Sequence, residues 1–194
     1  DLLEASEEDL SLNTDSGLFH VVGTPSIGVS WRDVAKSAET GTDGPRLLHA
    51  EEVFDSEGPT FPFGTHVALV EVDVETGAVE LQRLVACDDA GVILNPLLAD
   101  GQVHGGLAQG AAQALVEEFR YDDYGNPMTS NLSDYSVISA AELPMFERVV
   151  LETPTHINPL GAKGIGESGT VGATPAIQNA VIDALSHLGI RHLD

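Results

Sequence analysis

The alternation of apolar and acidic residues is clearest in two neighbouring runs of the chain. Valines stand at every second position from Val70, with acidic residues between them, and a second β-rich run follows a short loop that contains Gly77. Because successive side chains of a strand point to opposite faces, the pattern predicts an antiparallel hairpin, residues 65–73 and 78–87, with one packed and one solvated face. Cys87 ends the second run and is interpreted as a small core residue, because no cationic neighbour is evident.

The helical spacing of apolar residues predicts two helices in the second half of the chain. The first runs from about Gln102 to Phe119. The second has Thr174 as its N-cap, Pro175 as its first residue and Gly189 just past its end. Glycine in a helix costs about 1 kcal/mol relative to alanine, so the glycines of the first helix indicate that another helix or a ligand approaches its backbone closely. These glycines are Gly105, Gly106 and Gly110.

The first 60 residues carry weaker patterns. We expect an acidic helix over residues 1–12, a strand over residues 17–22 and a short helix that Ser30 caps and that ends near Glu39. Asp33 is placed to return the hydrogen bond of this cap. The stretch 40–60 combines Gly, Pro and acidic residues with few apolar ones, which is typical of a surface connection.

Together these elements favour the α+β fold class. The strand pairing that the pattern predicts is antiparallel, a further strand is expected over residues 146–151, and helices are interspersed with the strands. The surface connection divides the chain into an N-terminal part, residues 1–60, and a second part, residues 61–194.

Charge excludes several classes of function. The 194 residues include 31 Asp+Glu against 8 Lys+Arg, which gives a formal net charge of −23. Such an excess of negative charge repels nucleic acids and the anionic face of a membrane. Hydrophobic residues make up 42% of the chain, as expected of a folded domain rather than a disordered segment.

Cysteine content and hydropathy exclude further kinds of structure. The single cysteine excludes an internal disulfide framework and a multi-cysteine metal centre within the chain. No run approaches the roughly 20 consecutive apolar residues that span a bilayer, and the acidic start is unlike a signal peptide. We therefore expect a cytoplasmic protein with no membrane insertion, and the start without Met suggests part of a longer polypeptide.

The stretch 158–170 is the strongest candidate for chemistry. Within it, Gly164 to Gly169 match the dinucleotide-binding motif G-x-G-x-x-G. Residues 155–159 do not resemble the buried strand that this motif requires, and Asp183 falls inside the following helix rather than at a strand end. Nicotinamide binding is therefore the weaker alternative.

The same glycine loop can instead line an anionic ligand with its exposed amides, with Lys163 nearby and Glu167 in the same pocket. A carboxylate on an apolar loop suits a general base at neutral pH when burial removes it from water. The other interpretation is that Glu167 is a capping or solvent-facing acid, and spacing alone leaves both open.

Three segments together resemble a known family. Residues 89–96, 101–110 and 161–167 are similar, in order and spacing, to the C-terminal part of molybdenum hydroxylase large subunits, the xanthine oxidase and aldehyde oxidase family. The glycine-rich forms look closest to the aerobic carbon monoxide dehydrogenase large-subunit type. The resemblance implies a C-terminal molybdopterin-binding domain of the α+β class.

The resemblance also implies roles for individual residues. It places Glu167 at the family's catalytic glutamate, a general base that activates an oxygen nucleophile. Gln102 matches a glutamine that hydrogen-bonds the pterin, while His104 and Gln109 are weaker candidates for contact with it. The metal takes no protein side chain in this family. The backbone of a loop runs along the same cofactor, and its matching residues are Ala162, Lys163, Gly164, Ile165 and Gly166.

Cofactors and partners follow from the resemblance as expectations. The cofactor would be molybdopterin with molybdenum, in bacteria commonly the cytosine dinucleotide, while iron–sulfur clusters and FAD would lie on other domains or subunits. The partners would be a small-molecule substrate (aldehyde, N-heterocycle or carbon monoxide), the remainder of the large subunit, and the iron–sulfur and flavin subunits. A homodimer of heterotrimers is compatible with this reading.

Two further expectations concern the chain on its own. It would be inactive by itself, because other parts of the pocket are missing from it. The alternative function is a noncatalytic cofactor-binding or subunit-assembly module that retains the fold.

Overall fold

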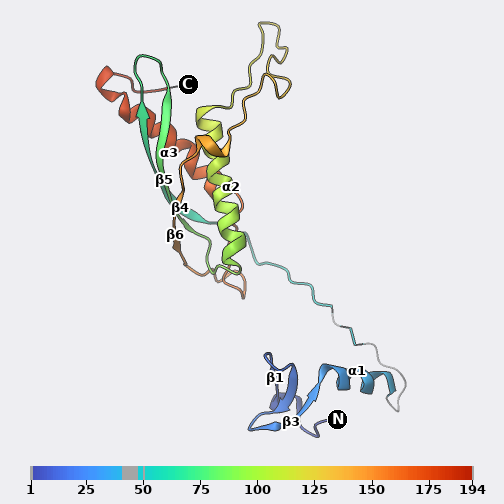
Figure 1. Cartoon of the computed structure of the whole chain (residues 1–194). Coiled ribbons are helices and arrows are strands. Elements are labelled where there is room, and N and C mark those ends of the chain that lie inside the picture. The colour runs from blue at the N-terminus through green and yellow to red at the C-terminus, as the bar shows by residue number, and fades with distance from the viewer. Residues whose placement is uncertain (1, 41–47, 50, 194) are drawn as a thin grey trace. The chain divides into compact units, whose positions relative to one another are not determined.

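The computed structural model describes residues 2–40, 48–49 and 51–193 (Figure 1). Its internal contacts divide the chain into two compact units, Asp1–Phe54 and Asp55–Asp194. The predicted surface connection falls partly on residues 41–47 and 50, which lie outside the described residues.

The first unit is a small antiparallel sheet followed by one helix. The three strands are hydrogen-bonded in the order β1-β2-β3. Its elements are the 3-10 turn η1 (Glu7–Asp9), β1 (Leu10–Asn13), β2 (Leu18–Val21), β3 (Thr24–Ser30) and α1 (Trp31–Thr40).

Two of the predictions for this unit are confirmed and one is wrong. The strand over residues 17–22 is β2, and Ser30 and Asp33 cap α1 reciprocally, with Ser30 Oγ 2.6 Å from an Asp33 carboxylate oxygen and 3.2 Å from the Asp33 amide. The helix over residues 1–12 is not formed, because β1 pairs antiparallel with β2. Its short polar–apolar alternation fits a strand, and pairing with a neighbour satisfies the backbone better than an isolated acidic helix does.

The second unit is built on a three-stranded sheet of order β4-β5-β6. β5 pairs antiparallel with β4, as the predicted hairpin requires, and parallel with β6, the strand expected over residues 146–151. No helix in the described residues is long and apolar enough to cross a membrane. The elements are β4 (Phe63–Val72), β5 (Val79–Asp89), α2 (Pro96–Leu115), η2 (Ala140–Glu142), β6 (Glu147–Leu151), α3 (Ser168–Ala184) and η3 (Ser186–Leu188).

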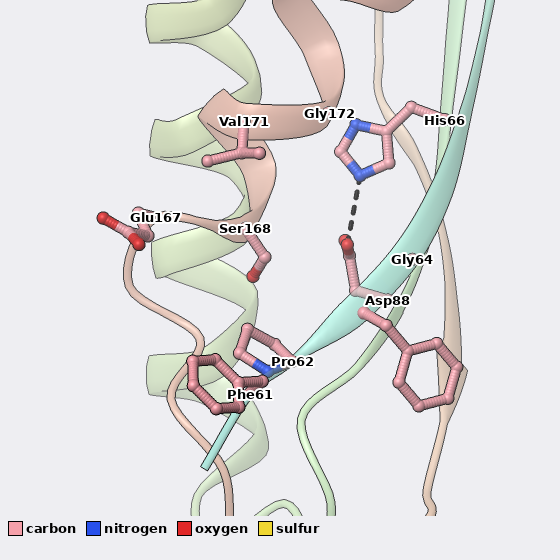
Figure 2. Close-up of a pocket in the computed structure, with 10 residues that line it drawn as sticks. Phe61, Pro62, Gly64, His66, Asp88, Glu167, Ser168, Val171 and Gly172 are labelled. Atoms are coloured by element: carbon pink, nitrogen blue, oxygen red, sulfur yellow. Dashed lines mark hydrogen bonds and ion pairs between the residues drawn. The ribbon is translucent and has the colours of Figure 1, made fainter. Parts of the chain in front are cut away.

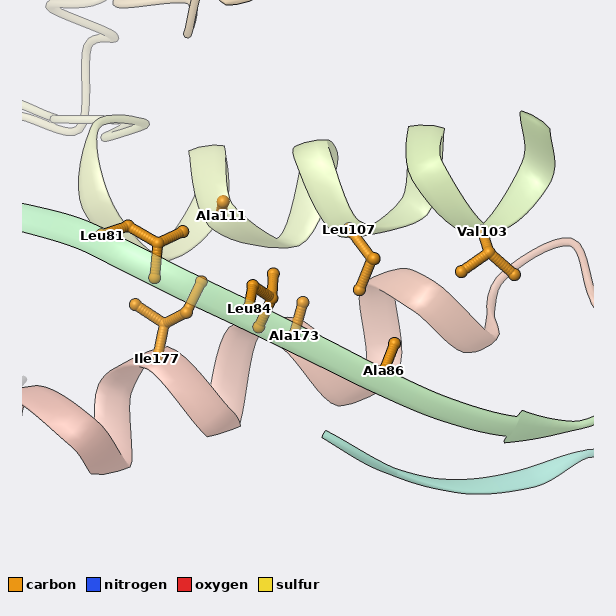
Figure 3. Close-up of a cluster of buried hydrophobic side chains, with 8 residues drawn as sticks. All are labelled: Leu81, Leu84, Ala86, Val103, Leu107, Ala111, Ala173 and Ile177. Carbon is orange, nitrogen blue, oxygen red and sulfur yellow. The ribbon is translucent and has the colours of Figure 1, made fainter. Parts of the chain in front are cut away.

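The hydrophobic core of this unit forms where β5 meets the two long helices (Figure 3). The apolar residues predicted at four-residue spacing on the first helix are Val103, Leu107, Ala111 and Leu115; the first three are fully buried there, and Leu115 is half-buried. The remaining members of the core are Leu81, Leu84 and Ala86 from β5 and Ala173 and Ile177 from α3. The packed helices and the mixed sheet, which contains the predicted antiparallel hairpin, confirm the α+β prediction.

The glycines of α2 explain how closely α3 can approach. A Cβ atom added at Gly110 would lie 2.7 Å from Ala173 Cβ, and one added at Gly106 would lie 3.0 Å from Gly169 Cα. The close neighbour that the sequence required is therefore a helix at these two positions. Gly105 differs, because a Cβ there would meet nothing within 4 Å.

The predicted start and end of α2 are wrong. α2 begins at Pro96, because Asn95 Oδ1 accepts a hydrogen bond from the Leu98 amide at 3.2 Å and Pro96 occupies the first turn, a pairing typical of helix starts. The helix ends at Leu115 rather than at Phe119.

α3 begins seven residues earlier than Pro175, at Ser168. Thr174 is not a cap but an interior residue, whose Oγ1 donates to the Gly110 carbonyl at 3.2 Å. Proline inside a helix lacks the N–H for one backbone hydrogen bond, and for this reason the helix was predicted to start at Pro175. Packing of the earlier turns against α2 outweighs that loss.

Cys87 is half-buried rather than a core residue, because it lies on the sheet face away from the core cluster.

The helix contact predicts opposite effects for two neighbouring glycines. Gly106→Ala should lower the free energy of unfolding of the 194-residue chain by about 1–3 kcal/mol, because the new methyl group has no room against α3. Gly105→Ala should raise it by about 0.5–1 kcal/mol, because a glycine is removed from a helix at an open position. Urea unfolding followed by circular dichroism measures both, and equal effects would contradict the described contact.

Candidate functional site

A cavity of about 230 Å³ lies between the start of α2 and the loop before α3. We call it the Gln102 cavity. It brings together Gln102 with Ala162, Lys163 and Ile165, which are more than 50 residues away along the chain. The other lining residues come from the segment that leads into α2 and from its first turns: Ala90, Val92, Ile93, Leu94, Asn95, Leu98 and Ala99.

Glycine conformations and hydrogen bonds hold the two ends of this loop in place. Gly91 and Gly161 both have positive φ, 65° and 66°, and the Val92 amide donates to the Gly161 carbonyl at 3.0 Å. The Lys163 amide donates to the Ala90 carbonyl at 2.8 Å. A Cβ at Gly91 would collide with the Gly161 carbonyl oxygen, so only glycine permits this approach.

The middle of the loop is different, because its amides are not used within the chain. Among the described residues, the backbone N–H groups from Gly164 to Glu167 have no hydrogen-bond acceptor. A Cβ at Gly164 or Gly166 would meet nothing within 4 Å, so open space lies beside these two glycines. The loop therefore presents adjacent unpaired donors, as a site for an anionic or oxygen-rich ligand requires.

The side chain of Lys163 anchors the loop. Its Nζ lies 2.8 Å from Asp89 Oδ1, with the two side chains 10% and 0% exposed, and 4.9 Å from the centroid of the Phe63 ring. Burial by itself would raise the pKa of Asp89, but hydrogen bonds from Lys163, Thr153 and the Gly91 amide hold this pKa at about 2. The expectation of Lys163 and Glu167 in one pocket is wrong, because Lys163 lines the Gln102 cavity and Glu167 does not.

Glu167 lines a second cavity, of about 260 Å³, which we call the His66 cavity. It occupies the N-cap position of α3, but its side chain makes no capping hydrogen bond and is exposed. Figure 2 shows its carboxylate at the edge of the group, away from the His66–Asp88 pair. The described residues thus leave this carboxylate in water and do not supply the burial expected for a general base.

The most buried polar pair of the site, His66 and Asp88, was not predicted from the sequence. His66 Nε2 lies 3.0 Å from Asp88 Oδ1, and each side chain is only 2% exposed. The signal was available, because the alternation that packs Val70 inward places His66 on the same face of β4. A titratable residue on the packed face of a strand calls for a partner.

The remaining candidate residues differ in whether their side chains already have a partner within the chain. The side chain of Gln102 is exposed and has no hydrogen-bond partner among the described residues, whereas Gln109 Nε2 donates to the Glu117 carboxylate at 3.2 Å. The His104 ring lies 6.1 Å from the ring of Phe146, centroid to centroid. Within the part of the chain that the structure describes, no group of three or more His, Cys, Asp or Glu side chains could hold a metal ion.

The dinucleotide motif lacks the structural context it would need. Residues 155–159 form bends and a turn instead of a strand, and Asp183 lies within α3. The Rossmann loop requires a strand that leads directly into the glycines. The two structural reasons for preferring another interpretation, no strand over residues 155–159 and Asp183 inside a helix, are thereby confirmed.

The chain matches one family model and is similar to large subunits of known enzymes. A family model described as "Molybdopterin cofactor-binding domain" matches residues 1–144. The carbon monoxide dehydrogenase large chain of Afipia carboxidovorans is 37% identical over 99% of this chain and 24% of its own length. The nicotine 6-hydroxylase large subunit of Paenarthrobacter nicotinovorans is 37% identical over 97% of this chain and 23% of its own length.

Solved structures agree with these sequence matches. Reconstituted CO dehydrogenase from Oligotropha carboxidovorans superposes with a TM-score of 0.87 at 35% identity, over 98% of this chain and 24% of that chain. Quinoline 2-oxidoreductase from Pseudomonas putida superposes with a TM-score of 0.85 at 36% identity, over 97% of this chain and 24% of that chain. The chain therefore spans about a quarter of the length of these relatives.

The buried Lys163–Asp89 pair leads to a test of stability. Lys163→Met leaves a carboxylate buried without its cation and should lower the free energy of unfolding by about 3–5 kcal/mol at pH 7. The double variant Asp89→Asn, Lys163→Met buries no charge, so its free energy of unfolding should fall by less than that of Lys163→Met. Urea unfolding of the 194-residue chain compares the variants, and a double variant less stable than Lys163→Met would contradict the pairing.

The same pair predicts a dependence on pH. The pKa of Asp89 in the folded chain is about 2, below its ordinary value of 3.8. The stability that ionised Asp89 contributes to the folded chain is therefore complete above about pH 4 and is lost as the pH falls toward 2. The stability difference between the wild-type chain and Asp89→Asn should therefore shrink from pH 5 to pH 3. A difference that stays constant over this range would contradict the described hydrogen bonds.

Proposed function

The chain belongs to the molybdopterin cofactor-binding domain family, and from that premise we propose that it forms one wall of the cofactor site in the large subunit of a molybdenum-dependent hydroxylase. The observation that carries the proposal is the Gln102 cavity, which is lined by a glutamine side chain without a partner among the described residues and by the loop whose central amides are also unpaired. These exposed groups are free to bind a ligand rich in hydrogen-bonding groups.

The chemistry of these donors fits a pterin with its phosphate groups. Amide N–H groups and a glutamine amide bind carbonyl, ring-nitrogen and phosphate groups, and none of them competes as a metal ligand. Open space at Gly164 and Gly166 lets a flat ligand approach the backbone, which a side chain at either position would prevent. Gln102, Ala162, Lys163, Gly164, Ile165 and Gly166 are the residues that would hold the group.

Glu167 is the general base in this proposal. When bound, the molybdenum–pterin group supplies the two-electron redox chemistry of a hydroxylation whose oxygen comes from water. The carboxylate of Glu167 accepts a proton from the oxygen nucleophile, and no capping hydrogen bond occupies this carboxylate. Support comes from its position directly after the loop and from the missing cap bond at the start of α3.

Substrate and partners belong to the complete protein. Relatives named as carbon monoxide dehydrogenase large chain and nicotine 6-hydroxylase large subunit support a small carbon substrate, either carbon monoxide or an N-heterocycle, with aldehydes as a third class. We infer the cytosine dinucleotide form of the cofactor, iron–sulfur and FAD centres on other domains or subunits, and a cytoplasmic assembly that includes the rest of the large subunit. A dimer of heterotrimers is the assembly proposed.

Glu167→Gln tests the general base in the complete enzyme. Loss of the proton acceptor should lower kcat by about 100- to 10,000-fold, while molybdenum and pterin contents stay at the wild-type level. Substrate oxidation with an artificial electron acceptor and metal analysis of the same preparation measure both. Glu80→Gln, at an exposed position of β5, is the matched control and should retain full activity. Normal turnover in Glu167→Gln would favour the noncatalytic module.

Gly166→Val tests the cofactor wall separately. The new side chain would project into the open space beside the loop, so cofactor content should fall at least about tenfold while the fold is retained. Gly58→Val is the control, because this glycine also has open space around it but lies outside both cavities. Pterin fluorescence after extraction, together with molybdenum analysis, gives the content. An unchanged content would contradict the placement of the cofactor against this loop.

A further inference from the structure

We propose that the buried His66–Asp88 pair is a positioning device for Glu167: it seats the first turns of α3 on the sheet and so sets the direction of the carboxylate. The inference rests on the proposed role of Glu167. Neither His66 nor Asp88 is expected to touch the substrate or the cofactor, so both are positioning residues.

The pair is accommodated on the sheet by a glycine. Gly64 of β4 lies opposite Asp88 of β5 in the strand register. A Cβ at Gly64 would lie 2.5 Å from Asp88 Oδ1 and 2.6 Å from the Cys87 carbonyl oxygen. Since real Cβ atoms do not come so close, only glycine leaves room for the carboxylate to turn toward His66.

A second glycine accommodates the pair on the helix. A Cβ at Gly172 of α3 would lie 2.4 Å from His66 Nδ1 and 2.7 Å from His66 Cγ. The imidazole therefore lies directly against the helix backbone, as Figure 2 shows, one turn after Ser168. Glu167 immediately precedes Ser168. The thickness and orientation of the ring therefore determine the backbone position from which the Glu167 side chain extends.

The hydrogen bond to Asp88 holds the ring in that orientation. Without it, the imidazole could rotate about its side-chain bonds and lose its close contact with Gly172. A buried pair of this kind fixes geometry more than it adds stability. His66 Nδ1 and Asp88 Oδ2 are indeed buried without partners among the described residues, which costs stability that an apolar pair would not lose.

The location of the pair connects it to the site. His66, Asp88, Glu167 and Ser168 all line the His66 cavity. A displacement of about 1 Å in a reacting group can lower the rate of a catalysed step by about 100-fold. Small changes at the His66–Asp88 pair should therefore appear in the chemical step rather than in binding.

The experiment compares three variants of the complete enzyme. His66→Leu removes the hydrogen bond, His66→Gln keeps an N–H donor near the position of Nε2, and Gly172→Ala pushes the helix away from the ring. We expect His66→Leu and Gly172→Ala to lower kcat by about 10- to 100-fold, with KM and molybdenum content unchanged, and His66→Gln to stay within about threefold of the wild type. The controls are His49→Leu, at a side chain that is 64% exposed, and Gly58→Ala.

Each outcome decides between the alternatives. A merely structural role predicts that molybdenum content falls together with kcat, or that His66→Gln is as impaired as His66→Leu, and either result overturns the inference. If His66→Leu does not fold, Gly172→Ala carries the test. Normal turnover in Glu167→Gln, measured in parallel, overturns the proposed function and this inference together. If Glu167→Gln is inactive but Gly172→Ala and a folded His66→Leu turn over normally, only the positioning role fails.

Discussion

The close approach of α2 to α3 is the constraint on which the rest of the second unit depends. Gly106 and Gly110 let the two backbones meet, with Gly169 and Ala173 on the opposite side of the contact. This packing overrides the local signals that would start α3 at Pro175, and it extends the helix back to Ser168. The extension places the end of the glycine loop, with Glu167, near the first turns of α2, and both the Gln102 cavity and the position of the candidate base follow from it.

Two consecutive carboxylates at the end of β5 complete the arrangement. Because neighbouring residues of a strand point to opposite faces, Asp88 meets His66 beneath α3, while Asp89 meets Lys163 on the other face. One pair sets the helix and the other sets the loop, and both act on the segment that ends at Glu167. Burial of these polar side chains costs desolvation free energy, and that cost is consistent with a site that needs its loop fixed.

Local patterns predicted the elements whose stability is local. The β4–β5 hairpin, strand β2 and the Ser30 cap all depend on residues close together in the sequence, and the structure confirms them. The helix starts were misplaced where contact between helices decides them. The pairs His66–Asp88 and Lys163–Asp89 are separated by 22 and 74 residues, and no spacing rule predicts such a partner. Gln102 and the glycine loop were grouped only through the family resemblance, and the shared cavity now supports that grouping independently.

Amide hydrogen exchange tests the central claim, that the unpaired amides from Gly164 to Glu167 face the cofactor, without altering any residue. The complete enzyme would be compared with the same protein made in cells that cannot synthesise the cofactor. A peptide that covers these residues should exchange at least about tenfold more slowly in the loaded enzyme, while the turn at Asp122 to Asn126, hydrogen-bonded within itself, should exchange equally in both forms. Equal exchange of the loop peptide in both forms would show that these amides do not face the cofactor.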